Sequence, residues 1–162
     1  MDKHHEPWVC REVEDTQAAV LALLRHADRQ VEILTHDFEP SLYDHDACLE
    51  ALEDLALRSH HSRIRILIQE PQVAALRGHR LLTLGRRLTS RIEMRRPDPE
   101  ASRITDSFLI VDGLGFLHRP YADSFKADAC LSEPLTARAL LQRFQAYWDV
   151  AETDPYLRRL TL

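Results

Sequence analysis

The sequence predicts a single α/β domain, with a mixed central sheet and helices on both faces. Stretches with apolar residues at helical spacing alternate with short runs that alternate around β-branched residues, an order typical of this class. A chain of 162 residues is long enough for one hydrophobic core and short for two. We therefore predict one domain over 15–151, between an N-terminal segment (1–14) and a C-terminal tail (152–162).

The composition limits which classes of protein this chain can belong to. Hydrophobic residues make up 44% and charged residues 29%, as in soluble globular proteins. No apolar run approaches the roughly 18 residues that cross a bilayer, and the charged N-terminus lacks the apolar segment of a secretory signal. We expect a cytoplasmic protein whose three widely spaced cysteines are reduced. The net charge of −5 argues against general binding to nucleic acid.

The first part of the chain predicts helix, strand and helix. Residues 14–29 are rich in Ala and Leu, with apolar positions on one helical face. Residues 31–37, VEILTHD, indicate a buried strand whose polar C-terminal end reaches the surface. After a loop with Pro40, residues 44–58 repeat the amphipathic pattern, with acidic residues near the start that suit the helix dipole.

The middle of the chain predicts strand, helix and strand. Residues 63–70, RIRILIQE, place three isoleucines on one face of a strand. Residues 72–88 follow a proline and have a helical pattern, although Gly78 and Gly85 argue against one unbroken helix. Residues 91–95 alternate and predict a short strand.

The last part predicts a hairpin, an edge strand and a long helix. The hairpin strands are 107–112 and 115–118, joined by an Asp-Gly turn. Residues 126–131 are expected at the sheet edge. Residues 134–151 begin with a proline in the first turn and carry Leu, Phe and Trp at helical spacing.

Several of these sequence segments, in this order, resemble those of a phospholipase D-like domain over roughly residues 15–151. SRIRILIQE is similar to its second strand, LLTLGRRLTSRIEMR to the next helix and strand, and ARALLQRFQAYWDVA to its closing helix. FLIVDG resembles the strand that carries the family signature HxKxxxxD. The resemblance implies the fold of that family, and two such units that meet at a pseudo-twofold or dimer interface.

The resemblance also implies where chemistry would lie. In that family the signature His attacks a phosphodiester phosphorus, the Lys stabilises the phosphate oxygens and the Asp supports the site. Counting back from Asp112, the Lys position holds Ser107 and the His position holds Thr105, and residues 119–122 do not match the pocket-lining Gly-Ser and Asn. A threonine without a base is a poor nucleophile and a serine has no charge for phosphate, so we expect an inactivated motif.

Two of these features also have purely structural explanations. An Asp-Gly pair at a strand end is a favoured turn, so Asp112 needs no site to explain it. The polar run from Thr105 to Ser107 is equally typical of a strand entry.

The nine histidines lack the arrangement of a metal site, and no nucleotide-binding loop or common hydrolase motif is present. We therefore expect no metal and no other cofactor.

Several basic side chains are candidates for anion binding. His36 ends the first predicted strand, where α/β sheets place ligands, and His118 lies near the implied phosphate pocket. Segment 77–103 holds eight arginines against three acidic residues, and its arginines could bind phosphates or an acidic partner. Lone surface histidines, and arginines that solvate an exposed helix, are the commoner explanations. The candidates are His36, His118, Arg119, Arg77, Arg80, Arg87 and Arg91.

Two functions follow as hypotheses. The first is a non-catalytic phospholipase D-like domain that acts as a binding or scaffold protein, as a homodimer, with an acidic protein or a phosphate-containing ligand as its partner. The alternative is a diverged phosphodiesterase or nuclease, in which His36, His79 or His118 replaces the missing imidazole and arginines replace the lysine. Nucleic acid has less support as a partner because the chain is acidic overall.

Overall fold

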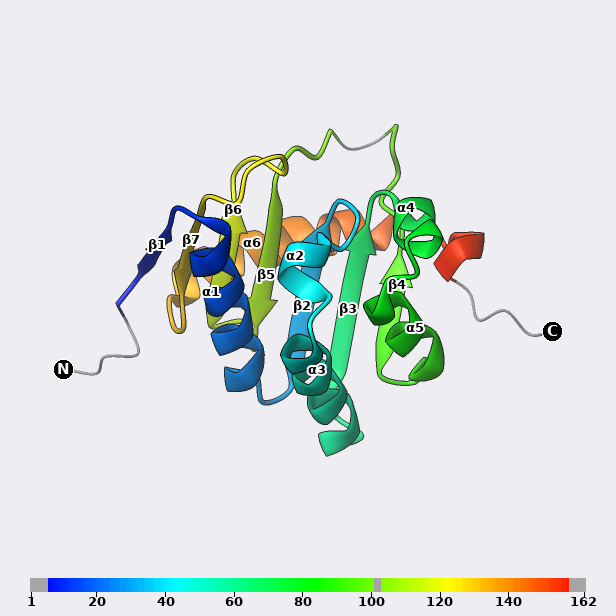
Figure 1. The fold of residues 1–162 in the computed structure, drawn as a ribbon, viewed down its shortest axis with the longest axis horizontal. Coiled ribbons are helices and arrows are strands. Elements are labelled where there is room, and N and C mark those ends of the chain that lie inside the picture. Colours follow the sequence, from blue (N-terminus) through cyan, green and yellow to red (C-terminus); the bar gives the residue numbers. More distant parts are fainter. Residues whose placement is uncertain (1–5, 101–102, 158–162) are drawn as a thin grey trace.

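The computed structural model describes residues 6–100 and 103–157, and in this part of the chain a seven-stranded sheet has the order β1-β7-β6-β5-β2-β3-β4 (Figure 1). The strands are β1 (Trp8–Cys10), β2 (Gln30–Thr35), β3 (Arg63–Ile68), β4 (Ile92–Arg95), β5 (Ser107–Val111), β6 (Gly115–Arg119) and β7 (Ala127–Cys130). The helices are α1 (Val13–His26), α2 (Pro40–Tyr43), α3 (Asp46–Arg58), α4 (Pro71–Leu76), α5 (Arg80–Arg87) and α6 (Pro134–Asp149), followed by a 3-10 turn (Pro155–Leu157).

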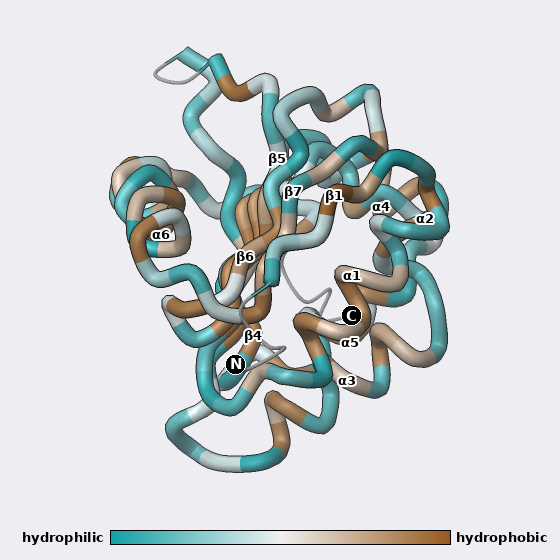
Figure 2. Tube along the Cα trace, turned by 90° about the vertical axis from the view of Figure 1, so that its left-hand side faces the viewer, coloured by the Kyte–Doolittle hydropathy of each residue, from teal (hydrophilic) through white to brown (hydrophobic). Residues whose placement is uncertain are grey.

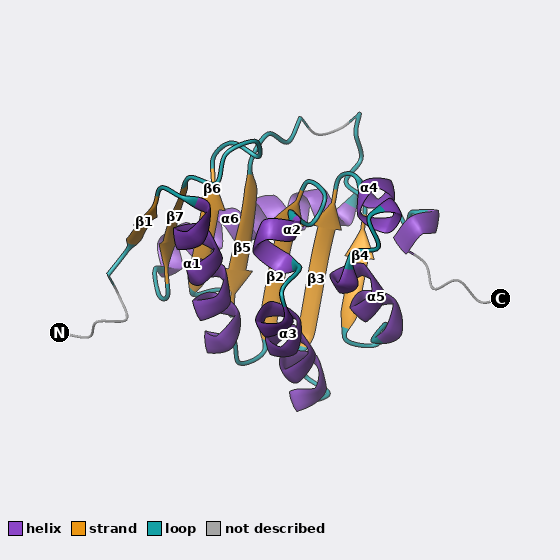
Figure 3. Ribbon diagram, in the orientation of Figure 1, coloured by secondary structure: helices purple, strands orange, loops and turns teal. Residues whose placement is uncertain are grey.

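The sheet separates two hydrophobic cores. Helices α1 to α5 cover one face, and α6 lies across the other (Figures 2 and 3). The larger core packs α1, α3 and α5 against the sheet, and the smaller one packs Phe144 and Trp148 of α6 against Phe108 and Phe116. Strand residues alternate between the two cores, because successive side chains in a strand point to opposite faces. The expected α/β class, with helices on both faces of a mixed sheet, is confirmed.

The strand directions bring several polar chain segments to one edge of the sheet. Strands β2, β3 and β4 are parallel, β5 is antiparallel to β2, and β6 is antiparallel to β5. The ends of β2, β3, β4 and β6 therefore meet the start of β5. We call this the carboxyl edge; it lies uppermost in Figure 1. Ligands of α/β proteins commonly bind beyond such an edge.

Most predicted elements lie within a few residues of their expected positions, with three differences. The helix expected over 72–88 is split into α4 and α5, because Gly78 takes a left-handed conformation with φ of 65° and His79 then caps α5. Pro40 begins the one-turn helix α2 where a loop was expected. The expected edge strand β7 is not at the edge, because β1 pairs with its outer side.

Strand β1 places residues 8–10 of the predicted N-terminal segment in the sheet. The division of the chain into segment, domain and tail stays a prediction. The three cysteines are buried thiols. None of the helices in the described residues has the length and apolar character that crossing a membrane requires.

Candidate functional site

Asp112 clamps the backbone at the edge opposite the carboxyl edge. It follows β5 with φ of 54°, a left-handed conformation that Asp adopts more readily than most residues. Its carboxylate accepts hydrogen bonds from the backbone N–H groups of Asp28, Arg29 and Gln30, each at 2.8 Å. These groups connect α1 to β2. Asp112 therefore holds a turn in place and lies at the opposite end of β5 from Thr105.

The two other signature positions lie at the carboxyl edge. Thr105 is exposed just before β5, and Ser107 is the first residue of that strand and is 4% exposed. Ser107 faces the helices α1 to α5, because Leu109, two residues on, belongs to their core. Its hydroxyl is buried without a hydrogen-bond partner in the described part of the chain. The cross-strand neighbour of Ser107 is Arg119.

Arg119 is buried, and all of its guanidinium nitrogens are engaged. Nη1 lies 3.0 Å from Oε1 of Glu39, and only 3% of the Arg119 side chain is exposed. Nε donates to the carbonyl of Ser124 at 3.0 Å and Nη2 to that of Ala122 at 2.8 Å. The guanidinium also stacks over the ring of Phe125. Arg119 therefore already has an internal anion, the carboxylate of Glu39.

The loop between β2 and α2 brings Glu39 to this position. Phe38 is buried with φ of 66°, a left-handed conformation that is uncommon for an aromatic residue. The hydroxyl of Thr35 donates to Oε2 of Glu39. Tyr43, from α2, is buried beside the pair; burial, and then the charge of Glu39, raises the pKa of its hydroxyl. Thr35, Glu39 and Arg119 therefore form a buried polar cluster, and Arg119 is the member that lies across the strand from Ser107.

A depression of about 220 Å³ lies over this cluster and is lined by both His36 and Arg119. The structure thus brings two of the candidate anion ligands together. The same depression is lined by three carboxylates, those of Asp37, Glu39 and Asp123. Carboxylates repel an anion, so its lining is poorly suited to a free phosphate.

His118 lies on the other face of the sheet from Arg119, because the two are neighbours along β6. Its Nε2 is 2.8 Å from Oδ2 of Asp106, and the same carboxylate binds Arg143 of α6 in a bidentate pair at 2.7 and 2.9 Å. Burial by itself would raise the pKa of Asp106, but the hydrogen bonds and charges of His118 and Arg143 hold it well below its usual range. Tyr147 accepts a further hydrogen bond from Arg143.

Asp106 and Arg143 were missed by sequence reasoning. The available signal was the alternation of β5 and β6, which places Asp106 and His118 on the same face of the sheet. Their partner Arg143 comes from a helix that follows much later in the sequence, and no local pattern indicates that contact.

His79, the third histidine considered as a replacement nucleophile, has a structural role. It is buried; its Nε2 lies 3.0 Å from the carbonyl of Phe38, and its Nδ1 accepts the N–H of Leu81. Burial lowers the pKa of its imidazole. Both ring nitrogens are therefore engaged in capping α5 and fixing the β2–α2 loop.

The candidate arginines of segment 77–103 are mostly paired with carboxylates from a different part of the chain. The pairs are Arg77 with Asp37 at 3.1 Å, Arg80 with Asp44 at 2.7 Å and with Asp46, and Arg87 with Glu53 at 2.8 Å. The guanidinium of Arg91 makes one hydrogen bond among the described residues, from Nη1 to the Ser90 carbonyl at 3.5 Å. The positive charge that is concentrated in the sequence is thus largely compensated in the structure.

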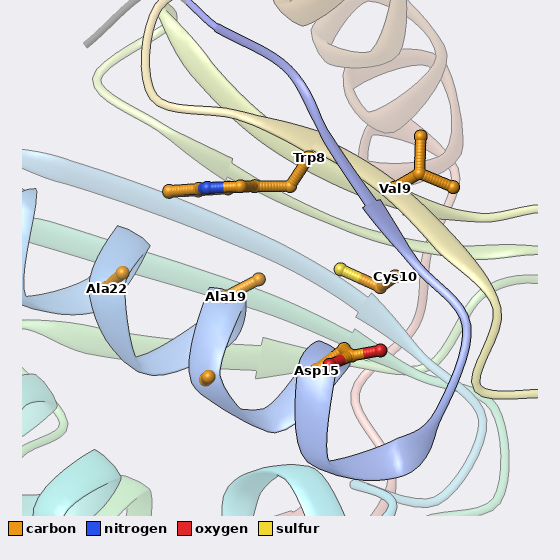
Figure 4. Close-up of a pocket in the computed structure, with 7 residues that line it drawn as sticks. Trp8, Val9, Cys10, Asp15, Ala19 and Ala22 are labelled. Carbon is orange, nitrogen blue, oxygen red and sulfur yellow. The ribbon is translucent and has the colours of Figure 1, made fainter. Parts of the chain in front are cut away.

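An apolar depression of about 450 Å³ lies between β1 and α1 (Figure 4). Trp8 extends over Ala19 and Ala22, and Cys10 lies below the strand. Burial raises the pKa of the Cys10 thiol, which favours its protonated form. Asp15 is the one charged residue in this lining. Without converging polar groups, this depression is not the candidate functional site, and no cluster of three or more His, Cys, Asp or Glu in the described chain could hold a metal ion.

Residues 12–160 match a family model described as a domain of unknown function, DUF7931. The chain belongs to the DUF7931 family. Among curated proteins, no match is found.

Many solved structures share the fold of this DUF7931 chain, and three of them illustrate it. Nuc from Salmonella typhimurium, a phospholipase D family member, is 16% identical with a TM-score of 0.65, and the match covers 91% of this chain and 97% of Nuc. NucT from Helicobacter pylori is 10% identical with a TM-score of 0.64, covering 93% and 98%. The archaeal chromatin protein TrmBL2 is 14% identical with a TM-score of 0.67; the match covers 95% of this chain but only 56% of TrmBL2. The phospholipase D-like fold implied by the sequence is thereby confirmed.

Replacing Asp112 by Ala tests the backbone clamp. We expect the free energy of unfolding to fall by about 2 kcal/mol, because three backbone N–H groups lose a charged acceptor. Asp112→Asn keeps a carbonyl acceptor and tolerates the left-handed conformation, so it should lose about half as much. Urea unfolding measures both. An alanine variant as stable as the wild type would contradict the clamp.

Replacing Asp106 by Asn tests the Arg143 pair through its pH dependence. The folded pKa of Asp106 lies below its ordinary value of 3.8, so its stabilisation is complete above that pH and is lost as the pH falls further. We expect the variant to be about 2 kcal/mol less stable near pH 7, and the difference to shrink near pH 3 in urea unfolding. The control is Asp128→Asn, an exposed carboxylate on β7, which pairs with β6. A difference for Asp106→Asn that does not change with pH would refute the prediction.

Proposed function

We propose that this chain is a non-catalytic phospholipase D-like domain that acts as a binding or scaffold protein. One observation carries the proposal: the space across the strand from Ser107 holds Arg119, which is buried and paired with Glu39, and Ser107 is the position at which the resemblance implies a lysine that holds phosphate. The carboxylate of that pair opposes phosphate binding, because like charges repel. Opening the space would break a buried ion pair, which typically costs about 3–5 kcal/mol.

The surroundings of the two signature positions support the same conclusion. A serine or threonine needs an adjacent base to act as a nucleophile. The Ser107 hydroxyl is buried and accepts or donates no hydrogen bond within the described residues. Arg119, the nearest cation across the strand, is committed to Glu39 and two carbonyls. Neither activation of a nucleophile nor charge stabilisation is provided there.

The alternative proposal is a diverged phosphodiesterase or nuclease. The observation that favours it is the His118–Asp106 contact, since a carboxylate that orients an imidazole is the usual support of a catalytic base. Arg143 lies beside it as a possible phosphate ligand, although both of its terminal nitrogens bind Asp106. His36, exposed at the carboxyl edge, is the second candidate base.

Hydrolysis assays separate the two proposals. With bis(p-nitrophenyl) phosphate and with single-stranded DNA, we expect no turnover by the wild type, because no activated nucleophile adjoins Thr105 or Ser107. The His36→Ala and His118→Ala variants serve as matched controls for a contaminating enzyme. Turnover by the wild type that disappears in either variant would establish the alternative instead.

The scaffold proposal includes a homodimer, because the resemblance implies that two such units meet. Light scattering at micromolar concentration should give the mass of two chains. A mass of one chain across the accessible concentrations would contradict this part of the proposal while leaving the inactive site untouched.

The partner class also belongs to the proposal. TrmBL2 is described as a DNA-binding chromatin protein, which makes nucleic acid a candidate. An acidic protein or a phosphate-containing ligand remains the partner that we propose, bound through Arg91, which has no carboxylate partner among the described residues, rather than in the carboxylate-lined depression beside His36. Most other candidate arginines already have carboxylate partners.

A further inference from the structure

A second depression at the carboxyl edge lies beyond β3 and β4, with a volume of about 410 Å³. Gln69 and Glu70 enter it directly from the end of β3, Arg96 from the end of β4, and Arg103 and Thr105 from the segment that leads into β5. Small-molecule sites commonly measure about 300–1,000 Å³ and favour the ends of adjacent parallel strands. No residue lines both this depression and the one over Glu39 and Arg119.

Two charged groups in this lining have no side-chain partner among the residues that the structure describes. Within residues 6–100 and 103–157, the Glu70 carboxylate and the Arg103 guanidinium form no ion pair or side-chain hydrogen bond, and both are at least partly exposed. The other charged groups of the lining are engaged: Arg96 pairs with Asp154 at 3.5 Å, and Asp98 accepts the N–H of Glu100. Arg103 is thus the cation of this lining without a partner, and Glu70 the carboxylate without a hydrogen bond, among the described residues.

Gln69 adds an unsatisfied polar group. Its Nε2 is buried and has no hydrogen-bond partner among the described residues. A buried donor left unpaired costs about 1–3 kcal/mol, so such groups usually have a ligand or a water. The backbone N–H of Gln69 binds the Thr35 carbonyl, and that of Glu70 binds the His36 carbonyl, which fixes both residues against the end of β2. The backbone that carries these two side chains is therefore held by the sheet itself.

The presence of both a positive and a negative side chain in the lining indicates which class of ligand it suits. A phosphate would meet the carboxylates of Glu70 and Asp98, and a simple amine would meet the guanidinium groups of Arg96 and Arg103. A molecule that carries both a carboxylate and an ammonium group satisfies each uncommitted charge. We propose that this depression binds a small zwitterion of the amino-acid class, with its carboxylate on Arg103 and its ammonium on Glu70. The apolar walls of Pro97, Pro99 and Ile104 would pack against its aliphatic part.

This inference goes beyond the proposed function and does not depend on it, because neither Arg103 nor Glu70 belongs to the Glu39–Arg119 cluster. An inactive domain and a diverged enzyme could each carry such a site.

Calorimetric titration of the full chain with a series of zwitterions tests the proposal. Glycine, β-alanine, γ-aminobutyrate and ε-aminocaproate differ in the spacing of their charges, and we expect saturable binding with an optimum at one spacing. N-acetylation or amidation of that ligand should weaken binding about tenfold or more, because each removes one charge-assisted contact. Failure of the whole series to bind would overturn the proposal.

Two variants assign the contacts. Arg103→Gln and Glu70→Gln should each weaken binding of the best zwitterion about tenfold. The matched controls are Lys126→Gln and Glu50→Gln, which remove one exposed charge of each sign outside this lining and should leave the affinity unchanged. Inorganic phosphate serves as the competing probe. If phosphate binds and Glu70→Gln strengthens that binding, the site takes anions and the zwitterion proposal is wrong.

Discussion

The contact between Arg119 and Glu39 determines what the carboxyl edge can do. Arg119 ends β6 on the face of α1 to α5, where its side chain is only 3% exposed and its charge has lost most of its contact with water. Glu39 and two carbonyls supply that replacement for water, as buried charges require. The left-handed turn at Phe38 and the short helix α2 are the backbone needed to deliver Glu39. The β2–α2 loop and the buried Glu39–Arg119 pair across the strand from Ser107 therefore depend on each other.

Strand alternation explains why the polar residues of this edge form separate clusters. Asp106 and His118 face α6 and combine with Arg143, whereas Ser107 and Arg119 face the opposite helices and combine with Glu39. Residues adjacent in sequence thus serve different faces. His118 and Arg119 are adjacent in the sequence, but their side chains lie on opposite faces of the sheet. Any chemistry assigned to this edge has to be assigned to one face at a time.

Periodicity predicted the fold well, because apolar spacing reports which face of an element is buried. It located β2, β3, β5, β6 and α6 to within a few residues. Strand β1 has three residues, too few for a pattern, and its place is set by pairing with β7. The charged contacts were beyond prediction for a similar reason. Arg77, Arg80 and Arg87 appear as a positive segment in the sequence, but their carboxylates come from residues 37–53.

Asp112 shows how a signature residue can persist without its chemistry. Its carboxylate binds three backbone N–H groups at the edge opposite Thr105, so its contribution is to the folding of the α1–β2 turn. That role is independent of a histidine or lysine at the other end of β5. The matching Asp is therefore evidence for the fold, while evidence for activity has to come from positions 105 and 107. There the chain has an exposed threonine and a buried serine whose only charged cross-strand neighbour is already paired.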